Sequence, residues 1–143
     1  MAMARNPLDE DMQRALLQAA RAARLDAYAP YSNFRVGAAV LDEQGQVHAG
    51  CNVENAAYPQ GVCAEAAALC AMVLAGGRRA TALLVVGEGP AWVTPCGGCR
   101  QKLREFAAPD TPVLVADGLG VQRCFTLEEL LPHSFGPEQL KPQ

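Results

Sequence analysis

The sequence lacks several features that define large classes of protein. Only two of its 143 residues are histidines. It has no unbroken apolar run of the roughly 20 residues that a membrane-spanning helix needs. Its 12 Lys and Arg are scattered among 15 Asp and Glu, so the net charge is -3 and no basic patch stands out. Because a polyanion needs such a patch, we expect a small-molecule substrate, with no nucleic acid and no membrane as partner.

The first residues also lack the apolar stretch of an export signal. Residues 1–11 contain acidic side chains where such a signal needs a hydrophobic segment. We therefore expect a cytoplasmic protein whose six cysteines are thiols or metal ligands, since disulfides are rare in a reducing compartment. Cys51, Cys70 and Cys124 lie in apolar segments, and we expect them to be small buried side chains.

Composition and patterning predict one folded domain over residues 1–143. Hydrophobic residues make up 50% of the chain and charged residues only 19%, which is enough apolar material for a core. Periodicity and end signals predict helices at 9–27, 63–74 and 95–106, strands at 36–41, 47–51, 83–86, 113–116 and 121–125, and a short helix after a capping box at 126–129. Strand, helix and strand in succession imply a parallel crossover. The expected fold class is α/β, a three-layer α/β/α sandwich with a mixed sheet of about five strands.

Three cysteines in two short segments form the most specific motif of the chain. Residues 63–65 read CAE, and residues 95–99 read PCGGC. Both segments are predicted at helix N-termini, where free N–H groups favour thiolate over thiol. Cys96 and Cys99 lie one helical turn apart, so both can face Cys63. A structural zinc site has four protein ligands, whereas a hydrolytic site has three and keeps the fourth position for water. Three cysteines therefore indicate a catalytic zinc site.

Glu65 completes this motif. It is too close to Cys63 in sequence to join it comfortably as a ligand, but it can reach water on the same ion. Its carboxylate can take a proton from that water, deliver one to a ring nitrogen and protonate a departing amine. A Cys or His two residues before Glu, with a later Pro-Cys-x-x-Cys, is the signature of zinc-dependent base deaminases. Alternatives are a redox pair or half of a closed zinc site for the two later cysteines, and an exposed helix-start carboxylate for Glu65.

Over nearly its whole length the sequence resembles the small, homotetrameric cytidine deaminases of pyrimidine salvage. Beyond the metal motif, the matching segments read YSNFRVGAA, GCNVENA, PCGGCRQ and LLPHSFGP. The resemblance implies hydrolytic deamination of cytidine and 2′-deoxycytidine to the uridine products, with release of ammonia. It also implies one Zn²⁺ per subunit and a homotetramer whose active sites are shared between subunits.

The resemblance further assigns individual residues. It implies that zinc is bound by Cys63, Cys96 and Cys99 and that Glu65 transfers protons. It implies a substrate pocket with Asn52 and Glu54 at the ribose hydroxyls, Phe34 beside the pyrimidine, and Ala56, Tyr58 and Phe135 in the wall, the last two partly from adjacent subunits.

The residues by themselves leave these substrate roles more open. Asn52 and Glu54 alternate at a strand end and suit a diol, but a solvated strand end explains them equally well. A lone aromatic such as Phe34 usually belongs to a core. Phe135 lies in a proline-containing tail that is easiest to explain as docking on another surface, for which a neighbouring subunit suffices.

One position departs from the family pattern. An arginine commonly follows Cys-Ala-Glu in these deaminases, whereas this chain has Ala66. Zinc with three thiolates carries a net charge of -1, which opposes ionisation of bound water, so loss of a nearby cation makes hydroxide harder to form. Two helix N-termini and Arg100 are candidates for compensation. The freed space also suggests a pocket that tolerates N4-substituted cytidines.

Two other functions share part of these features. A deaminase of a cytosine-containing antibiotic of the blasticidin type has the metal motif and lacks the arginine, but Phe34, Asn52 and Glu54 are typical of plain nucleoside deaminases. A noncatalytic zinc-stabilised interaction domain would have no open coordination position and release no ammonia. Glu65 disfavours that second alternative.

Overall fold

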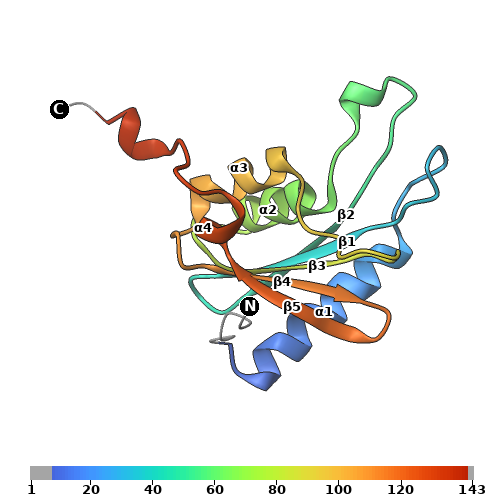
Figure 1. Cartoon of the computed structure of the whole chain (residues 1–143), viewed down its shortest axis with the longest axis horizontal. Coiled ribbons are helices and arrows are strands. Elements are labelled where there is room, and N and C mark those ends of the chain that lie inside the picture. The colour runs from blue at the N-terminus through green and yellow to red at the C-terminus, as the bar shows by residue number, and fades with distance from the viewer. Residues whose placement is uncertain (1–7, 142–143) are drawn as a thin grey trace.

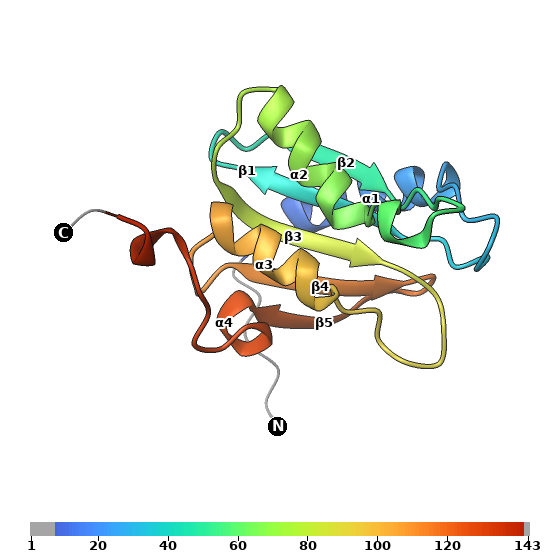
Figure 2. The ribbon, with the colours of Figure 1, turned by 90° about the horizontal axis from the view of Figure 1, so that it is seen from above.

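A computed structural model describes residues 8–141 of the chain. Five strands form one mixed sheet, with one long helix on one face and three helices on the other (Figures 1 and 2). The elements are α1 Glu10–Leu25, β1 Gly37–Asp42, β2 Val47–Cys51, η1 Tyr58–Gln60, α2 Ala64–Leu74, β3 Ala80–Val86, α3 Gly97–Phe106, β4 Pro112–Asp117, β5 Gly120–Thr126, α4 Leu127–Leu130 and η2 Pro137–Gln139. The predicted three-layer α/β/α sandwich is confirmed. The missing export signal was predicted from residues 1–11, of which residues 1–7 lie outside the described residues.

The strand order of the sheet is β2-β1-β3-β4-β5. β3 and β4 are parallel, with Leu83 opposite Val113, and the other neighbours are antiparallel. α3 makes the crossover between the parallel pair, and α2 follows the edge strand β2. As a result α2 and α3 lie side by side with their N-termini at the same end of the sheet (Figure 2).

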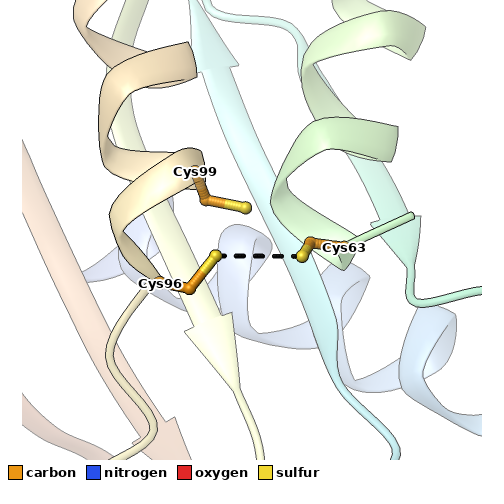
Figure 3. Close-up of side chains that lie close together, drawn as sticks. All are labelled: Cys63, Cys96 and Cys99. Carbon is orange, nitrogen blue, oxygen red and sulfur yellow. Dashed lines mark hydrogen bonds between the residues drawn. The ribbon is translucent and has the colours of Figure 1, made fainter. Parts of the chain in front are cut away.

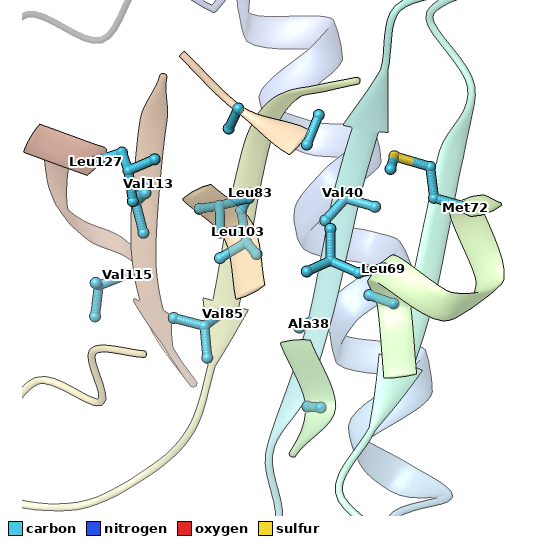
Figure 4. Packing of buried hydrophobic residues seen from close by; sticks show 14 of the residues in the cluster. Ala38, Val40, Leu69, Met72, Leu83, Val85, Leu103, Val113, Val115 and Leu127 are labelled. Carbon is cyan, nitrogen blue, oxygen red and sulfur yellow. The ribbon is translucent and has the colours of Figure 1, made fainter. Parts of the chain in front are cut away.

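Two layers of apolar side chains hold the helices against the sheet. Successive residues of a strand point to opposite faces, so Leu83 and Val85 of β3 face α2 and α3, whereas Leu84 faces α1. Figure 4 shows Leu103 of α3 and Met72 of α2 packed on the first of these faces. Each fully buried side chain of this kind contributes about 1.5–3 kcal/mol relative to exposure. This packing fixes the positions of both helices, and therefore of the residues at their N-termini.

Local signals for helix ends are confirmed at two places and wrong at one. Asp9 caps α1 by accepting a hydrogen bond from the Met12 N–H at 2.8 Å, and Thr126 forms the predicted capping box with Glu129. Pro95, predicted within the first turn of α3, instead precedes the helix. Cys96 takes the extended backbone conformation of an N-cap, so helical geometry begins only after it.

The burial prediction for the other cysteines holds only in part. Cys124 is buried and Cys51 partly buried, but Cys70 is exposed on α2. Because α2 is apolar on nearly every side, the sequence does not distinguish its buried face from its open one. Among residues 8–141, no helix combines the length and the apolar character needed to cross a membrane.

Candidate active site

The structure brings the three cysteines of the motif together at the paired helix N-termini. Cys63 is the N-cap of α2, Cys96 is the N-cap of α3, and Cys99 lies in the first turn of α3. Their Sγ atoms all lie within 4.8 Å of one another, and those of Cys63 and Cys96 are 3.9 Å apart (Figure 3). The segments are more than thirty residues apart in sequence, so the packing of α2 beside α3 creates the cluster.

This spacing fits a tetrahedral zinc ion. Zinc–sulfur bonds of 2.3 Å place two sulfur ligands about 3.8 Å apart. Burial raises the pKa of Cys99 and of Cys63, so these thiols do not readily ionise by themselves. Burial also acts to raise the pKa of Cys96, but hydrogen bonds from the Cys99 N–H and from the neighbouring thiols outweigh it and lower that pKa. Three such thiols become thiolates together around a cation, and the cluster therefore has the chemistry of a zinc site.

Glu65 is buried next to this cluster. It lies in the first turn of α2 and is only 5% exposed, which is unusual for a carboxylate. Burial raises its pKa, while a hydrogen bond with Cys99 and the positive charge of Lys102 act in the opposite direction. A carboxyl group whose pKa is raised toward neutrality can both accept and return a proton.

An open cavity of about 520 Å³ adjoins Cys63. It is formed by residues of the segments 31–32, 52–55 and 58–63, so it includes Asn52, Glu54 and Tyr58 from the predicted set. Cavities of this size hold small ligands. Asn52 and Glu54, the predicted ribose-binding pair, therefore line the same cavity as Cys63, one of the predicted zinc ligands.

Glu54 anchors one wall of this cavity. Its carboxylate accepts hydrogen bonds from the N–H groups of Tyr31 at 2.9 Å and Ser32 at 3.1 Å, and from the Ser32 hydroxyl at 2.5 Å. The Ser32 hydroxyl holds the pKa of Glu54 below its ordinary value, so the carboxylate stays ionised. Sequence reasoning gave Ser32 and Tyr31 no role, although both lie in the YSNF segment that carried the resemblance.

Asn52 is held in a similar way. Its Oδ1 accepts from the Val36 N–H and its Nδ2 donates to the Phe34 carbonyl, each at 2.8 Å. The Asn52 side chain is thus oriented by the backbone of residues 34–36. Phe34 itself is 43% exposed, so the alternative of a core role is wrong. Phe34 and Ala56 flank the residues that line the cavity but do not line it themselves.

Phe135 lies elsewhere. It lines a separate cavity beside α3, where the Gln101 side chain donates a hydrogen bond to the Phe135 carbonyl at 2.9 Å. The C-terminal segment that carries it lies at the opposite end of the ribbon from η1, which borders the open cavity (Figure 1). Phe135 therefore does not line the cavity of its own chain.

The structure changes the interpretation of Ala66 and Arg100. Ala66 lines a groove between α2 and α3, not the open cavity, so the space left by the missing arginine does not widen the predicted substrate pocket. The Arg100 guanidinium donates to the Pro95 carbonyl at 2.7 Å, the Leu130 carbonyl at 2.8 Å and the Thr94 hydroxyl at 3.1 Å. Arg100 holds the backbone before Cys96 in place, and its guanidinium is engaged with these three oxygen atoms.

Fold and site together define a class of protein, the zinc-dependent hydrolases built on an α/β/α sandwich. Comparison with known proteins identifies the member of that class. The family model of the cytidine and deoxycytidylate deaminase zinc-binding region matches residues 10–115 of this chain. The chain belongs to the cytidine and deoxycytidylate deaminase family, and zinc is the metal that its three-cysteine group is positioned to bind.

Individual relatives agree with this assignment. The chain is 42% identical over 125 residues to a cytidine deaminase of Sporosarcina psychrophila, covering 87% of this chain and 92% of that protein. A crystal structure of cytidine deaminase from Burkholderia pseudomallei superposes with a TM-score of 0.80 at 46% identity, covering 85% of this chain and 98% of that one. The crystal structure of cytidine deaminase from Mycobacterium leprae gives a TM-score of 0.72 at 41% identity, covering 84% of this chain and 97% of that one.

Proposed function

We propose that this chain catalyses the hydrolytic deamination of cytidine and 2′-deoxycytidine, with release of ammonia, in pyrimidine salvage. The observation that carries the proposal is a buried carboxylate, Glu65, next to three thiols at two helix N-termini. The relatives described above are cytidine deaminases and match most of the chain. Neither an antibiotic deaminase nor a noncatalytic zinc domain finds support among these comparisons.

In this proposal Cys63, Cys96 and Cys99 hold the zinc ion as thiolates. Zinc held by these residues would supply an acidified water molecule. Glu65 accepts the proton of that water and passes it to the ring nitrogen next to the amino-bearing carbon. The oxygen of the water adds to that carbon, and Glu65 then takes the remaining proton of this oxygen and delivers it to the departing amine, so that ammonia leaves and one carboxyl group acts in turn as base and acid. Its burial keeps bulk water from competing for the proton.

The same cavity accounts for recognition of a nucleoside. Asn52 and Glu54 bind the ribose hydroxyls, since the ionised Glu54 carboxylate accepts hydrogen bonds strongly. The bonds that already hold both side chains orient them before substrate arrives, which lowers the entropic cost of binding. Phe34, at the edge of the cavity, packs beside the pyrimidine, and Ala56 and Tyr58 help to form the wall of the pocket.

Ribose recognition makes the preference for nucleoside over free base a direct test. Zinc-loaded protein is expected to release ammonia from cytidine with a kcat/KM about 100-fold higher than from cytosine, because hydrogen bonds to a charged acceptor contribute about 1.5–3 kcal/mol each. Glu54→Gln should lower kcat/KM about tenfold or more for cytidine and leave the slow reaction of cytosine unchanged. Ultraviolet absorbance and a coupled ammonia assay measure both reactions.

Two results would count against these assignments. Equal use of cytosine and cytidine would exclude ribose recognition by Asn52 and Glu54. A zinc-loaded protein that releases ammonia from neither compound would contradict the proposed function. Ser32→Ala serves as the matched control, since it removes one hydrogen bond to Glu54 but keeps the charge, and its effect should be smaller than that of Glu54→Gln.

A homotetramer with shared active sites extends the proposal. Tyr58 is 76% exposed at the rim of the cavity, and Phe135 is 57% exposed on a segment remote from that cavity. Exposed aromatic residues of this kind are common in protein interfaces. In a closed assembly the Phe135 segment of one subunit would complete the cavity of another. All six cysteines are free, which agrees with activity in the reducing cytoplasm.

Complementation between two inactive subunits tests the shared site. Phe135→Ala and Glu65→Gln chains, each of low activity alone, are co-expressed. A site that takes Glu65 from one chain and Phe135 from another is intact in about one quarter of random pairings, so about a quarter of wild-type activity should return. Assembly mass is measured alongside turnover. Mixed assemblies without recovered activity, or full activity of Phe135→Ala alone, would argue against a shared site.

A further inference from the structure

Because position 66 is alanine, the negative charge of the zinc-thiolate site must be offset by a cation other than an arginine at that position. We propose that Lys102, on α3, supplies the positive charge that offsets the negative charge of the zinc-thiolate site, in place of an arginine at position 66. The inference rests on the proposed function, because it takes the three cysteines as thiolate ligands.

The position of the Lys102 side chain is the first observation. Lys102 follows Gly98 by four residues and Cys99 by three, so all three lie on one face of α3. Long side chains in a helix lean toward its N-terminus. Here the Lys102 Nζ lies 3.6 Å from the point that a Cβ on Gly98 would occupy. The ammonium group therefore lies over the first turn of α3, the turn that carries Cys99.

The second observation is the groove that Lys102 shares with Ala66. The groove measures about 540 Å³, and its wall is formed mainly by apolar residues such as Leu69, Val73 and Phe106, with Glu105 as the acidic residue among them. An arginine at position 66 would extend into this space from α2. With Ala66 the space is open, and Lys102 enters it from α3. In this chain the positive charge therefore lies on the α3 wall of the groove.

The third observation concerns the partners of Lys102. Lys102 lines the same groove as Ala66, so its side chain adjoins the first turn of α2 as well as lying over the first turn of α3. Within residues 8–141 it forms no ion pair that would neutralise it. Arg100, the other nearby cation, is occupied by two carbonyls and a hydroxyl.

The expected effect follows from the charge balance of metal binding. Near neutral pH, three thiols give up their protons when zinc binds, so the site changes from neutral to a charge of -1. A nearby ammonium stabilises the charged product more than the neutral reactant. It also favours ionisation of the water on the metal. Removal of the Lys102 charge should therefore weaken zinc binding and slow turnover.

Four variants test this inference by zinc affinity, measured in competition with a chromophoric chelator at fixed pH. Lys102→Met should bind zinc roughly five- to tenfold more weakly, the size expected for one partly screened charge at short range. Lys102→Arg keeps the charge and should stay close to wild type. Adding Ala66→Arg to Lys102→Met should restore most of the affinity. Arg14→Met removes an exposed charge from α1, on the other face of the sheet, and should have no effect.

The outcomes separate a role of charge from one of shape. Wild-type affinity in Lys102→Met would overturn the inference, and so would equal weakening in Lys102→Arg or no recovery with Ala66→Arg. Thermal unfolding of each variant verifies that the fold is retained. Ammonia release by the unsubstituted protein tests the proposed function separately. If the protein bound zinc but did not deaminate cytidine, the proposed function would be wrong, and the comparison of zinc affinities would still test the role of Lys102.

Discussion

Glu65→Gln is expected to abolish nearly all turnover of cytidine while zinc stays bound. Glutamine has the shape of glutamate but cannot accept the proton of the water or deliver it to the ring. Proton transfer by a positioned side chain contributes about 10²–10⁴-fold, and Glu65 is proposed to serve several transfers in turn, so we expect kcat to fall by about 10³-fold or more. Steady-state kinetics on cytidine and metal analysis of the same preparation measure both quantities.

The burial of Glu65 makes a control necessary, because a change at a buried site can also damage the fold. Glu128→Gln makes the same substitution at an exposed position of α4 and should be neutral in both assays. Near-wild-type turnover of Glu65→Gln would remove the proposed proton carrier. Loss of zinc from this variant would instead show that Glu65 maintains the metal site, and would also contradict the assigned role.

Cys99→Ala is expected to cause the largest loss of metal. Cys99 is the buried member of the cluster and lies within 4.8 Å of both other sulfur atoms. Its removal would leave two thiolates, too few to close the site. Replacement of residues that merely support a metal ligand costs 10–100-fold in affinity, so loss of a ligand should cost more than about 100-fold and remove activity with it. Zinc content after dialysis against a chelator gives the result.

Cys70→Ala is the matched control for this experiment. Cys70 is an exposed cysteine of α2, and alanine is well tolerated in a helix, so this variant should keep its zinc and its activity. If Cys99→Ala retained zinc as firmly as Cys70→Ala, the three-cysteine site would be wrong. Addition of zinc after chelation should restore the activity of the unsubstituted chain and of Cys70→Ala, but not that of Cys99→Ala.

Most of the fold could be predicted from local patterns. Alternating apolar residues, the Asp9 cap and the Thr126 capping box are signals within a few residues, and the corresponding elements are present. Boundaries were less accurate where the signal was not local. β3 begins at Ala80, three residues before the predicted start, because its pairing with β1 extends over residues whose strand character the sequence does not show. Cys70 was misplaced for the related reason that an apolar helix does not reveal its exposed face.

The candidate site divides in the same way. The ligand residues and Glu65 could be found from spacing, since a thiolate-forming cysteine at a helix start is a property of a short segment. The role of Ser32 in holding Glu54 and the position of Lys102 could not, because each depends on a residue brought near by folding. The prediction that the space at Ala66 would widen the substrate pocket was also wrong, because Ala66 lines the groove between α2 and α3. Sequence alone does not say which side of α2 faces the cavity and which side faces the groove.

The amino-acid sequence by itself determined the class of chemistry, namely three thiols and a carboxylate at two helix starts, in a chain with the strand and helix pattern of an α/β sandwich. Only the tertiary structure decided that Cys63 lies beside Cys96 and Cys99, that Phe135 is remote from its own cavity, and that Lys102 occupies the groove opened by Ala66. The physical reason is one of range. Helix caps and strand alternation depend on neighbours along the chain, whereas the distance between α2 and α3 depends on how both helices pack on one sheet.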